Sequence, residues 1–469
     1  MNRISQYLYF TLLLAVVASC KLNEKYERPE FAKSDLYRGV ETEDTTSLAD
    51  VRWKELFQDT TLQKLIQEGL DNNLNLQIAV ARIESAEASL LSAKGALFPS
   101  LNVNGSASKS RLASAPSAAT GFATQQYQLY GNANWEIDIW GKLRSAKRAS
   151  LAQLLSSEAY RRAVQTRLIA DISTAYFSLL GLDKQLEITE LTVESRKKYE
   201  ETVSSLKEAS IVTGADVMQS KANLHAAQVT IPDLKQRIRE TENALSVLLN
   251  RSPGAIERQA LESQVISDSI KTGVPILLLS NRPDVQQAEF TLRSSFEMVK
   301  NAHAYFYPSI SLTGTAGYNT TVIEQFFDPV SFFARAAGSL TQPIFQQNQN
   351  KSRLRAAEAS QKEALATYEQ TILTAGQEVS DALFSFEVAD DKLEIRSQQV
   401  EALKNAVSYN EELLQYNSVN YIDVLTSQQN LLTAQLSIVD DQLQKLNSLV
   451  ELYRALGGGW QYESASNLR

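Results

Sequence analysis

The chain contains 469 residues, with 18 glycines, 10 prolines and a single cysteine. This length is enough for two or three ordinary domains, and the composition excludes both a low-complexity chain and a disulfide-stabilised scaffold. A formal net charge of -8 without a basic stripe argues against a nucleic-acid partner. No segment after the N-terminal leader approaches the roughly 18 consecutive apolar residues that a membrane helix needs. If the mature chain spans a membrane, it does so with strands.

Residues 1–19 have the pattern of a signal peptide, with a charged Arg3, an apolar run and small residues before Cys20. The last of these features resembles the bacterial lipobox, whose cysteine is acylated. An unmodified cysteine that happens to follow a signal peptide is the alternative. We expect Cys20 to carry a lipid anchor and residues 20–52 to form a polar tether. The residue after the cysteine is Lys21 rather than Asp, which resembles lipoproteins sorted to the outer membrane.

The mature chain is organised as two copies of one unit, offset by roughly 205 to 209 residues. Ala96–Leu101 recurs as Tyr305–Ile310, and Gly214–Ser220 recurs as Tyr421–Ser427. The offset is far longer than the repeat of a solenoid, so each copy is a large structural unit. The expected division is a first repeat at 53–260, a second repeat at 261–460 and a tail at 461–469.

Each copy contains two segments in which apolar and polar residues alternate. One example is Leu101, Val103 and Gly105, which are interleaved with Asn102 and Asn104. A period of two gives a strand one apolar and one polar face. The four predicted strands lie at about 100–113, 125–139, 308–320 and 331–344. Their length suits a tilted crossing of a bilayer, although a half-buried sheet in a water-soluble protein shows the same alternation.

Aromatic residues favour the membrane interpretation, because they gather where the predicted strands meet helices. Rings at one level are typical of the interface between a bilayer and water. The residues of this predicted belt are Phe98, Trp140, Tyr305, Phe306, Tyr307 and Phe345.

The remaining segments have a period of about 3.5 residues, which indicates long coiled-coil helices. Val217, Leu224 and Ile231, for example, recur at intervals of seven. Pro232 cannot donate a backbone hydrogen bond, so we expect the helix to kink or restart there. The predicted helices lie at about 145–206, 216–250, 350–416 and 423–456.

A four-stranded sheet with two bare edges cannot stand in lipid, so these strands have to close with copies of the same chain. Two, three or four copies all give an acceptable even number of strands. The attached helices follow the symmetry of the ring, so we expect them to continue it as a hollow cylinder of helices.

Several motifs, in order along nearly all of the mature chain, resemble the TolC-like outer-membrane factors. They are Trp53–Phe57 with Asp59 and Leu62, Asn72–Asn73, Ala81–Glu84, Trp135–Gly141, Leu248–Asn250 and Asn281–Asp284. The resemblance implies a mostly α-helical protein with transmembrane β-strands: a trimer whose twelve strands form a β-barrel, continued by an α-helical barrel. It further implies an outer-membrane efflux duct that works with a periplasmic adaptor and an inner-membrane pump. The lipobox resembles the branch that serves proton-driven exporters of the RND type, which carry drugs or metal ions.

The resemblance also implies that the tips of the helix pairs close the duct at its periplasmic end. Asp423 falls at a family aperture position, where three copies would form an acidic ring that attracts cations. Tyr416, Tyr421 and Asp216 are the other aperture candidates. The alternative is that Asp216 and Asp423 only cap the returning helices. This chain departs from the family pattern at Thr426, where a second acid is common, and its second tip lacks the usual glycine.

The sequence gives little support for an enzymatic function. The two histidines, His225 and His303, are not paired with each other or with a cysteine, so we expect no catalytic, metal or cofactor site. The glycines at 457–459 lack the features of a phosphate loop and predict a helix end instead. Two other classes remain open: a lipid-anchored coiled-coil periplasmic scaffold and a solute-binding lipoprotein. The scaffold does not explain the four strands, and the lipoprotein should show short alternating strands and helices.

Overall fold

A computed structural model of the chain describes residues 25–29, 47–111, 123–264, 281–416, 419 and 421–460. The predicted signal peptide, Cys20 and the tail at 461–469 lie outside these residues. The chain forms two compact units, and each unit takes residues from both halves of the sequence. Unit 1 comprises Met1–Phe31, Arg82–Glu158 and Gln287–Glu369, and unit 2 comprises Ala32–Ala81, Ala159–Gln286 and Gln370–Arg469.

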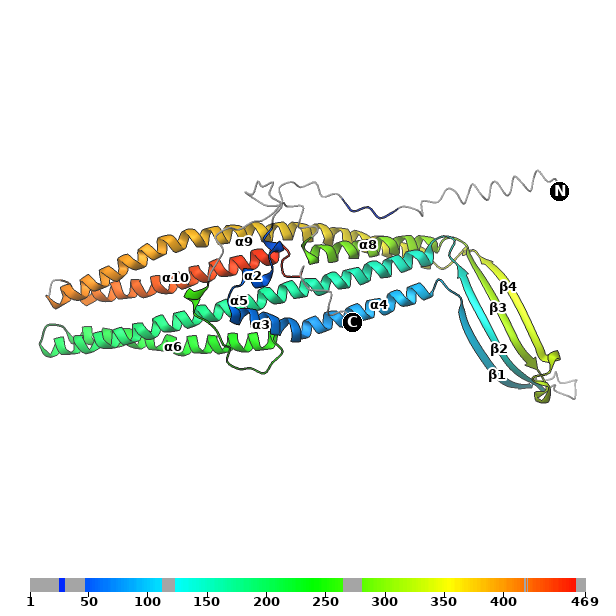
Figure 1. The fold of residues 1–469 in the computed structure, drawn as a ribbon, viewed down its shortest axis with the longest axis horizontal. Coiled ribbons are helices and arrows are strands. Elements are labelled where there is room, and N and C mark those ends of the chain that lie inside the picture. Colours follow the sequence, from blue (N-terminus) through cyan, green and yellow to red (C-terminus); the bar gives the residue numbers. More distant parts are fainter. Residues whose placement is uncertain are drawn as a thin grey trace. The chain divides into compact units, whose positions relative to one another are not determined.

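Unit 1 contains a four-stranded antiparallel sheet with the strand order β1-β2-β3-β4 (Figure 1). The strands are β1 (Ser100–Arg111), β2 (Ala123–Ile137), β3 (Ser309–Thr320) and β4 (Phe332–Thr341). Two short 3-10 turns, η5 (Ile323–Gln325) and η6 (Pro329–Ser331), lie between β3 and β4. The outer edges of the sheet belong to β1 and β4, and within the described residues neither edge has a strand partner.

The fourth strand is shorter than the sequence predicts. It ends at Thr341, whereas the alternation continued to 344. Pro343 explains the difference, because proline has no N–H to donate to the ladder. The side chains of Ile344 and Phe345 are exposed beyond the end of the strand.

Helix α8 (Pro283–Ala304) packs in unit 1 along the first turns of α5 (Lys142–Glu208). Asn301 Nδ2 donates to the Lys142 carbonyl oxygen at 2.8 Å, and Ser294 Oγ donates to the Ala149 carbonyl oxygen at 3.1 Å. Side chains of α8 thus bind backbone oxygens of α5, which fixes the register of the two helices.

Residues 25–29 lie against the same helix α8. Arg28 forms two hydrogen bonds with the Glu289 carboxylate, at 2.8 and 2.6 Å. Tyr26 packs edge-on against Phe296, with the ring centroids 5.7 Å apart. Burial of the Tyr26 hydroxyl, followed by the negative charge of Glu289, raises the pKa of this tyrosine to about 12. A short segment near the N-terminus is therefore held by both a charged and an aromatic contact.

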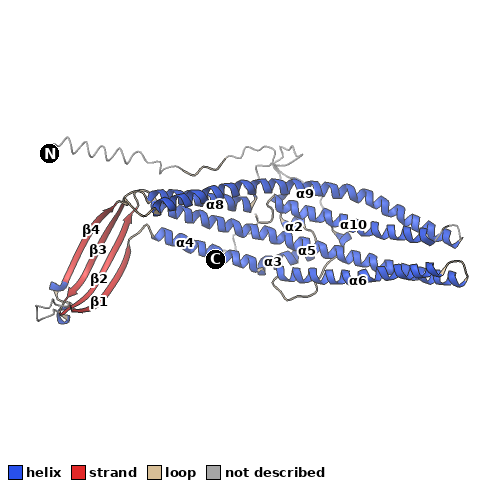
Figure 2. Cartoon of the chain, turned by 180° about the vertical axis from the view of Figure 1, so that it is seen from behind, coloured by secondary structure: helices blue, strands red, loops and turns tan. Residues whose placement is uncertain are grey.

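Unit 2 is built mainly from two antiparallel helix pairs, α5 with α6 (Gly214–Leu248) and α9 (Gln349–Gln415) with α10 (Tyr421–Ala455) (Figure 2). Helices α5 and α9 each contain 67 residues, and α6 and α10 each contain 35. Helices α5 and α10 approach closely at Gly181, where a Cβ atom would overlap the side chain of Leu443. A larger residue at this position would force the Leu443 side chain to move.

The seven-residue spacing correctly predicts the buried face of α6. Val217, Leu224, Ile238 and Leu245 are buried, and Ile231 is partly buried. These side chains lie on one stripe of the helix, as an apolar heptad requires.

Of the two outcomes expected at Pro232, the restart is wrong, because α6 continues through this residue from Gly214 to Leu248, and the kink stays a prediction. A proline inside a helix removes one backbone hydrogen bond and costs about 3 kcal/mol. Pro232 itself is exposed, whereas Leu224 before it and Leu234 after it are buried. Packing of the apolar stripe on both sides of the proline offsets this cost.

The remaining short elements of unit 2 are η2 (Leu48–Asp50), α2 (Trp53–Leu56), α3 (Thr60–Asn72), the first turns of α4 (Leu74–Gly95) and η3 (Leu261–Ser263). Asp59 caps α3 by accepting from the backbone N–H of Thr61 and of Leu62. Its other carboxylate oxygen accepts from Tyr176 Oη at 2.6 Å and from Gln264 Nε2 at 2.9 Å. Asp59 therefore joins three segments that are distant in the sequence.

None of the described helices combines the length and the apolar character that a membrane crossing requires.

Candidate functional site

The two faces of the sheet differ in chemistry. The cross-strand register places Leu101, Val103, Leu129, Leu312 and Leu340 on the same face. Leu101 and Val103 are 80% and 79% exposed within the chain. Apolar side chains at this exposure would normally be buried, so this apolar face needs a non-aqueous neighbour.

The opposite face is lined by amides and hydroxyls that bind one another across the strands. Asn104 Nδ2 donates to Asn132 Oδ1 at 2.7 Å, and Thr313 Oγ1 donates to Asn134 Oδ1 at 3.1 Å. Ser311 and Ser339 share a further hydrogen bond of 2.6 Å between their hydroxyls. This polar face is suited to contact with water, so the two faces of the sheet suit different environments.

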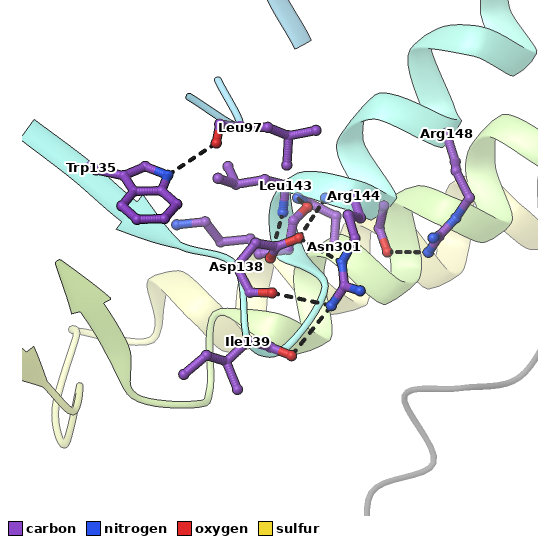
Figure 3. Close-up of polar contacts among 10 residues, drawn as sticks. Leu97, Trp135, Asp138, Ile139, Leu143, Arg144, Arg148 and Asn301 are labelled. Atoms are coloured by element: carbon purple, nitrogen blue, oxygen red, sulfur yellow. Dashed lines mark hydrogen bonds and ion pairs between the residues drawn. The ribbon is translucent and has the colours of Figure 1, made fainter. Parts of the chain in front are cut away.

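The Trp135–Gly141 motif forms the junction between β2 and α5 (Figure 3). Asp138 accepts hydrogen bonds from the backbone N–H of Leu143 at 3.1 Å and of Arg144 at 2.9 Å. A carboxylate at this position satisfies free N–H groups and complements the helix dipole. Trp135 Nε1 donates to the Leu97 carbonyl oxygen at 3.0 Å and ties β2 to the chain that enters β1.

The six predicted belt residues all belong to unit 1, but they have different environments. Trp140 stacks on Tyr307 with centroids 4.9 Å apart and donates to the Pro308 carbonyl oxygen at 2.7 Å. The Tyr305 ring lies within cation–π distance of both Lys142 and Arg353. The other three rings, of Phe98, Phe306 and Phe345, are exposed.

A second aromatic group, missed from the sequence, lies at the opposite end of the strands. Tyr318 contacts Phe326, Phe327 and Phe332, with centroid distances of 6.2, 5.6 and 5.7 Å. The sequence feature that could have revealed this group is the pair Phe326–Phe327 in the connection between β3 and β4. The sheet thus carries aromatic rings at both ends of its strands.

The first helix tip, between α5 and α6, is closed by a capping box. The Asp216 carboxylate accepts from the Thr213 backbone N–H at 2.8 Å and from the Thr213 hydroxyl at 2.7 Å. Both hydrogen bonds lower the pKa of Asp216. Ser210 adopts a φ of 62° at the end of α5, and Ile211 N donates back to the Leu206 carbonyl oxygen. Asp216 is therefore the third residue of α6 and acts at least as a helix-capping group.

At the second tip, Tyr416 and Asp423 are exposed, and Asp423 lies in the first turn of α10. The Tyr421 side chain lies outside the described part of the chain. Behind the tips, Val424 packs in a buried cluster with Tyr199, Val203 and Val217, with Val212, Leu414 and Leu425 at its margin. This tip cluster joins α5, α6, α9 and α10, so the two helix pairs are held together by apolar contact.

A buried arginine explains the Asn281–Asp284 motif. Arg282 pairs with Asp284 at 2.6 Å and with Glu378 at 2.7 Å, and Arg454 also pairs with Glu378 at 3.1 Å. Burial disfavours the charge of Arg282, but its two carboxylate partners outweigh this effect and raise its pKa. Gly457 packs against the Asn281 backbone, and Trp460 Nε1 donates to the Asn281 carbonyl oxygen at 2.8 Å. The motif thus anchors the end of α10.

Neither histidine belongs to a reactive cluster among the residues that the structure describes. His225 Nδ1 lies 2.9 Å from Gln228 Oε1 on the exposed side of α6, and His303 is exposed in the last turn of α8. In the same part of the chain, no group of three or more His, Cys, Asp or Glu residues is placed to hold a metal ion.

The model of the outer membrane efflux protein family matches residues 65–251 and 274–458, which is most of the chain. The chain belongs to the outer membrane efflux protein family. The resemblance inferred from the sequence motifs is therefore confirmed.

Relatives of this efflux protein match over nearly their whole length. The solvent efflux pump outer membrane protein SrpC of Pseudomonas putida is 30% identical over 456 residues, covering 95% of this chain and 97% of that protein. Outer membrane protein OprJ of Pseudomonas aeruginosa is 31% identical over 460 residues, covering 96% and 95%. The solved structure of the outer-membrane channel OprN has a TM-score of 0.87 and 26% identity, and covers 94% of this chain and all of that chain.

These matches establish an efflux component of the outer membrane with the fold of the outer-membrane channels.

Proposed function

We propose that three copies of this efflux protein close their sheets into one transmembrane β-barrel, and that their helices continue it as a tunnel into the periplasm. Four strands in each of three copies give twelve. The duct conducts small molecules passively and performs no covalent chemistry. The observation that carries the proposal is the exposed apolar face of a sheet whose edge strands, β1 and β4, have no partner within the described chain.

The dimensions of the sheet support a bilayer crossing. Eight residues separate Ile310 at the junction from Tyr318 in the second aromatic group, which corresponds to about 27 Å at 3.4 Å per residue. The apolar band of an outer-membrane barrel is about 25 Å tall and is flanked by aromatic girdles on both sides. The two aromatic groups of the sheet fit these two girdles.

Features of both the sheet and the helices support closure with other copies of the chain. In the sheet, the bare backbone groups of β1 and β4 need partners in lipid, where water is absent. In the helices, Leu373, Phe384 and Ile395 are exposed on α9 at intervals of eleven residues. This interval returns to the same helix face, so the three residues form an apolar stripe for a neighbouring copy. Strand number alone does not select three copies, because two or four copies also give a barrel with an even number of strands. The choice of three follows from the family resemblance.

A duplicated unit accounts for the matched elements of the two halves. The pairs α5 with α6 and α9 with α10 have the same lengths, 67 and 35 residues. Each pair follows two antiparallel strands. We therefore retain the division into repeats at 53–260 and 261–460 as part of the proposal. A duplication lets one chain supply two similar sectors of a ring.

The helix tips form the aperture in this proposal. Asp423 supplies an acidic ring, and Tyr416 and Tyr421 narrow the opening beside it. The hydrogen bonds of Asp216 to Thr213 support a role for this residue in holding the tip rather than in contacting the solute.

A periplasmic adaptor and an inner-membrane pump of the RND type complete the export system in this proposal. SrpC is described as part of a solvent efflux pump, and we infer small amphipathic molecules as the cargo class here. Acylation of Cys20 would add a lipid anchor beside the barrel.

The decisive experiment combines single-channel recording in a planar bilayer with the mass of the purified protein in mild detergent. We expect conducting trimers. A matched pair of variants then tests the two faces: Val103→Arg should impair insertion, whereas Asn104→Arg should insert and conduct. An arginine in the lipid costs about 2–4 kcal/mol at the bilayer midplane, and a charge in the lumen costs little. Monomers that never conduct would instead favour the lipid-anchored scaffold.

A further inference from the structure

One charged side chain stands in the middle of the polar face of the sheet. Arg335 lies near the centre of β4, opposite Thr315, in a row that continues through Asn132 to Asn102. Its face is set by this register, because Thr315 shares its face with Thr313, which bonds Asn134. The only other charged residue on this face of the described strands is Glu136 at the junction end, which pairs with Lys142 at 2.5 Å.

No carboxylate of the described strands lies beside Arg335. Its row contains an amide and a hydroxyl next to it, and β3 has no charged residue at all. In the closed barrel of the proposed function, β4 meets β1 of the next copy. The side chains of β1 on the polar face are Ser100, Asn102, Asn104, Ser106, Ser108 and Ser110. Whatever the register of that closure, β1 therefore offers no acid to Arg335.

The acids nearest along the chain are in the connection between β3 and β4. Glu324 and Asp328 lie there, beyond the end of β4 at Phe332. Arg335 is three positions from that strand end, which corresponds to about 10 Å at the rise of a strand. The positive charge is therefore set apart from the acids at both ends of the sheet.

Two aromatic rings lie on the same face of the sheet in the row next to that of Arg335. Phe333 is two residues earlier on β4, and it pairs in register with Gly317, which pairs in turn with Tyr130. The Tyr130 and Phe333 rings approach across this glycine, with centroids 6.3 Å apart and an interplanar angle of 56°. A cation without a carboxylate partner in the described strands, one row from two aromatic rings on the same face, can bind a molecule that carries both a negative charge and a flat apolar body.

We propose that Arg335, Phe333 and Tyr130 form a lumen-facing subsite for aromatic organic anions. This inference rests on the proposed function, because it needs the polar face to line the lumen. Arg335 pairs with the carboxylate or sulfonate of the solute, and the two rings contact its apolar body. Three such subsites at one level of the barrel slow the passage of aromatic anions and leave aromatic cations unaffected.

The test is current block in single-channel recordings, with naphthalene-2-sulfonate as the probe and a naphthylmethylammonium ion as its cationic counterpart. We expect the sulfonate to interrupt the wild-type current. Arg335→Gln should weaken this block about two- to fivefold, as expected for an exposed ion pair. Phe333→Leu should shorten each block event because ring contact is lost. The control is Lys109→Gln, which removes a cation from the apolar face of the same sheet and should leave the block unchanged.

The outcomes separate this inference from the duct itself. If the wild type conducts but the sulfonate and the ammonium ion act alike, the subsite is overturned while the duct stands. A block that Arg335→Gln leaves intact overturns it as well. A block that Lys109→Gln removes shows that the other face lines the lumen. If no variant and no wild-type protein conducts, the proposed function and the subsite fail together. Raising the salt concentration to 1 M should weaken the block by the sulfonate, because the Debye length falls to about 3 Å and the attraction to Arg335 is screened.

Discussion

Arg282 donates a hydrogen bond through Nη1 to the backbone oxygen of Ala455 at 2.8 Å, although the two residues are 173 positions apart. The arginine is 3% exposed and also pairs with the Asp284 and Glu378 carboxylates. A single side chain thus holds the end of α10 against the segment that begins α8. Loss of one partner from such a network leaves buried charge without compensation.

We expect Arg282→Gln to lower the free energy of unfolding by about 2 kcal/mol, because the partly exposed carboxylates of Asp284 and Glu378 lose their common hydrogen-bond donor. Urea unfolding followed by circular dichroism measures the effect. The matched control is Arg251→Gln, since Arg251 forms a more exposed ion pair with Glu68 at 3.4 Å. A change of less than about 1 kcal/mol is expected there. Equal effects of the two variants would contradict the role of the network.

Acid should weaken the same network. Burial opposes ionisation of Asp284, but the hydrogen bonds and charge of Arg282 outweigh it and hold the pKa of this carboxyl below its usual 3.8. A lowered pKa stabilises the fold fully above the unfolded value, and the contribution is lost as the pH falls through the folded pKa. The difference in urea midpoint between wild type and Asp284→Asn should therefore be constant from pH 7 to about 5 and shrink below about pH 4. A difference that grows on acidification would be inconsistent with this sign.

The acid at the second tip should control conduction. Asp423→Ala is expected to raise single-channel conductance and to weaken cation preference, because it removes the negative ring of the proposed aperture. Asp216→Ala is the control, since that carboxylate is bound to Thr213 and its loss should mainly fray the start of α6. Reversal potentials in a salt gradient measure the preference. If Asp423→Ala leaves both values unchanged, Asp423 only caps α10.

The tip cluster should keep the helix pairs together. Val424 is fully buried against side chains of α5 and α6, so Val424→Asp would place an unpaired charge in an apolar contact. We expect this variant to separate the tips and to increase the open probability of the channel. Met218→Asp is the matched control, because Met218 follows the buried Val217 but is 62% exposed. Equal open probabilities for the two variants would show that the tip cluster does not hold the helix pairs together.

The strands and long helices could be predicted from the sequence because each repeats a simple period. Leu101 and Val103 share a face as the alternation requires, and Val217 and Leu224 are buried as the heptad requires. The helix does not restart at Pro232, since packing of the whole apolar stripe outweighs the local cost of a proline.

Other features had no periodic signal. Arg282, Glu378 and Ala455 are brought together only by the fold, so no spacing in the sequence could reveal their contacts. The second aromatic group depends on how the connection between β3 and β4 folds back toward Tyr318. Aperture assignments remain predictions, because they depend on copies of the chain that meet around an axis.

In the proposed barrel, the edges of β1 and β4 that lack partners within the described chain would also set the kinetics of maturation. Backbone groups that lack partners cannot enter lipid one chain at a time, because each would lose its hydrogen bonds to water. Under this proposal, chains have to meet before or during their entry into the membrane. The rate of appearance of the mature species should rise more steeply than linearly with protein concentration, so a cell that makes little of this protein would carry disproportionately few finished ducts.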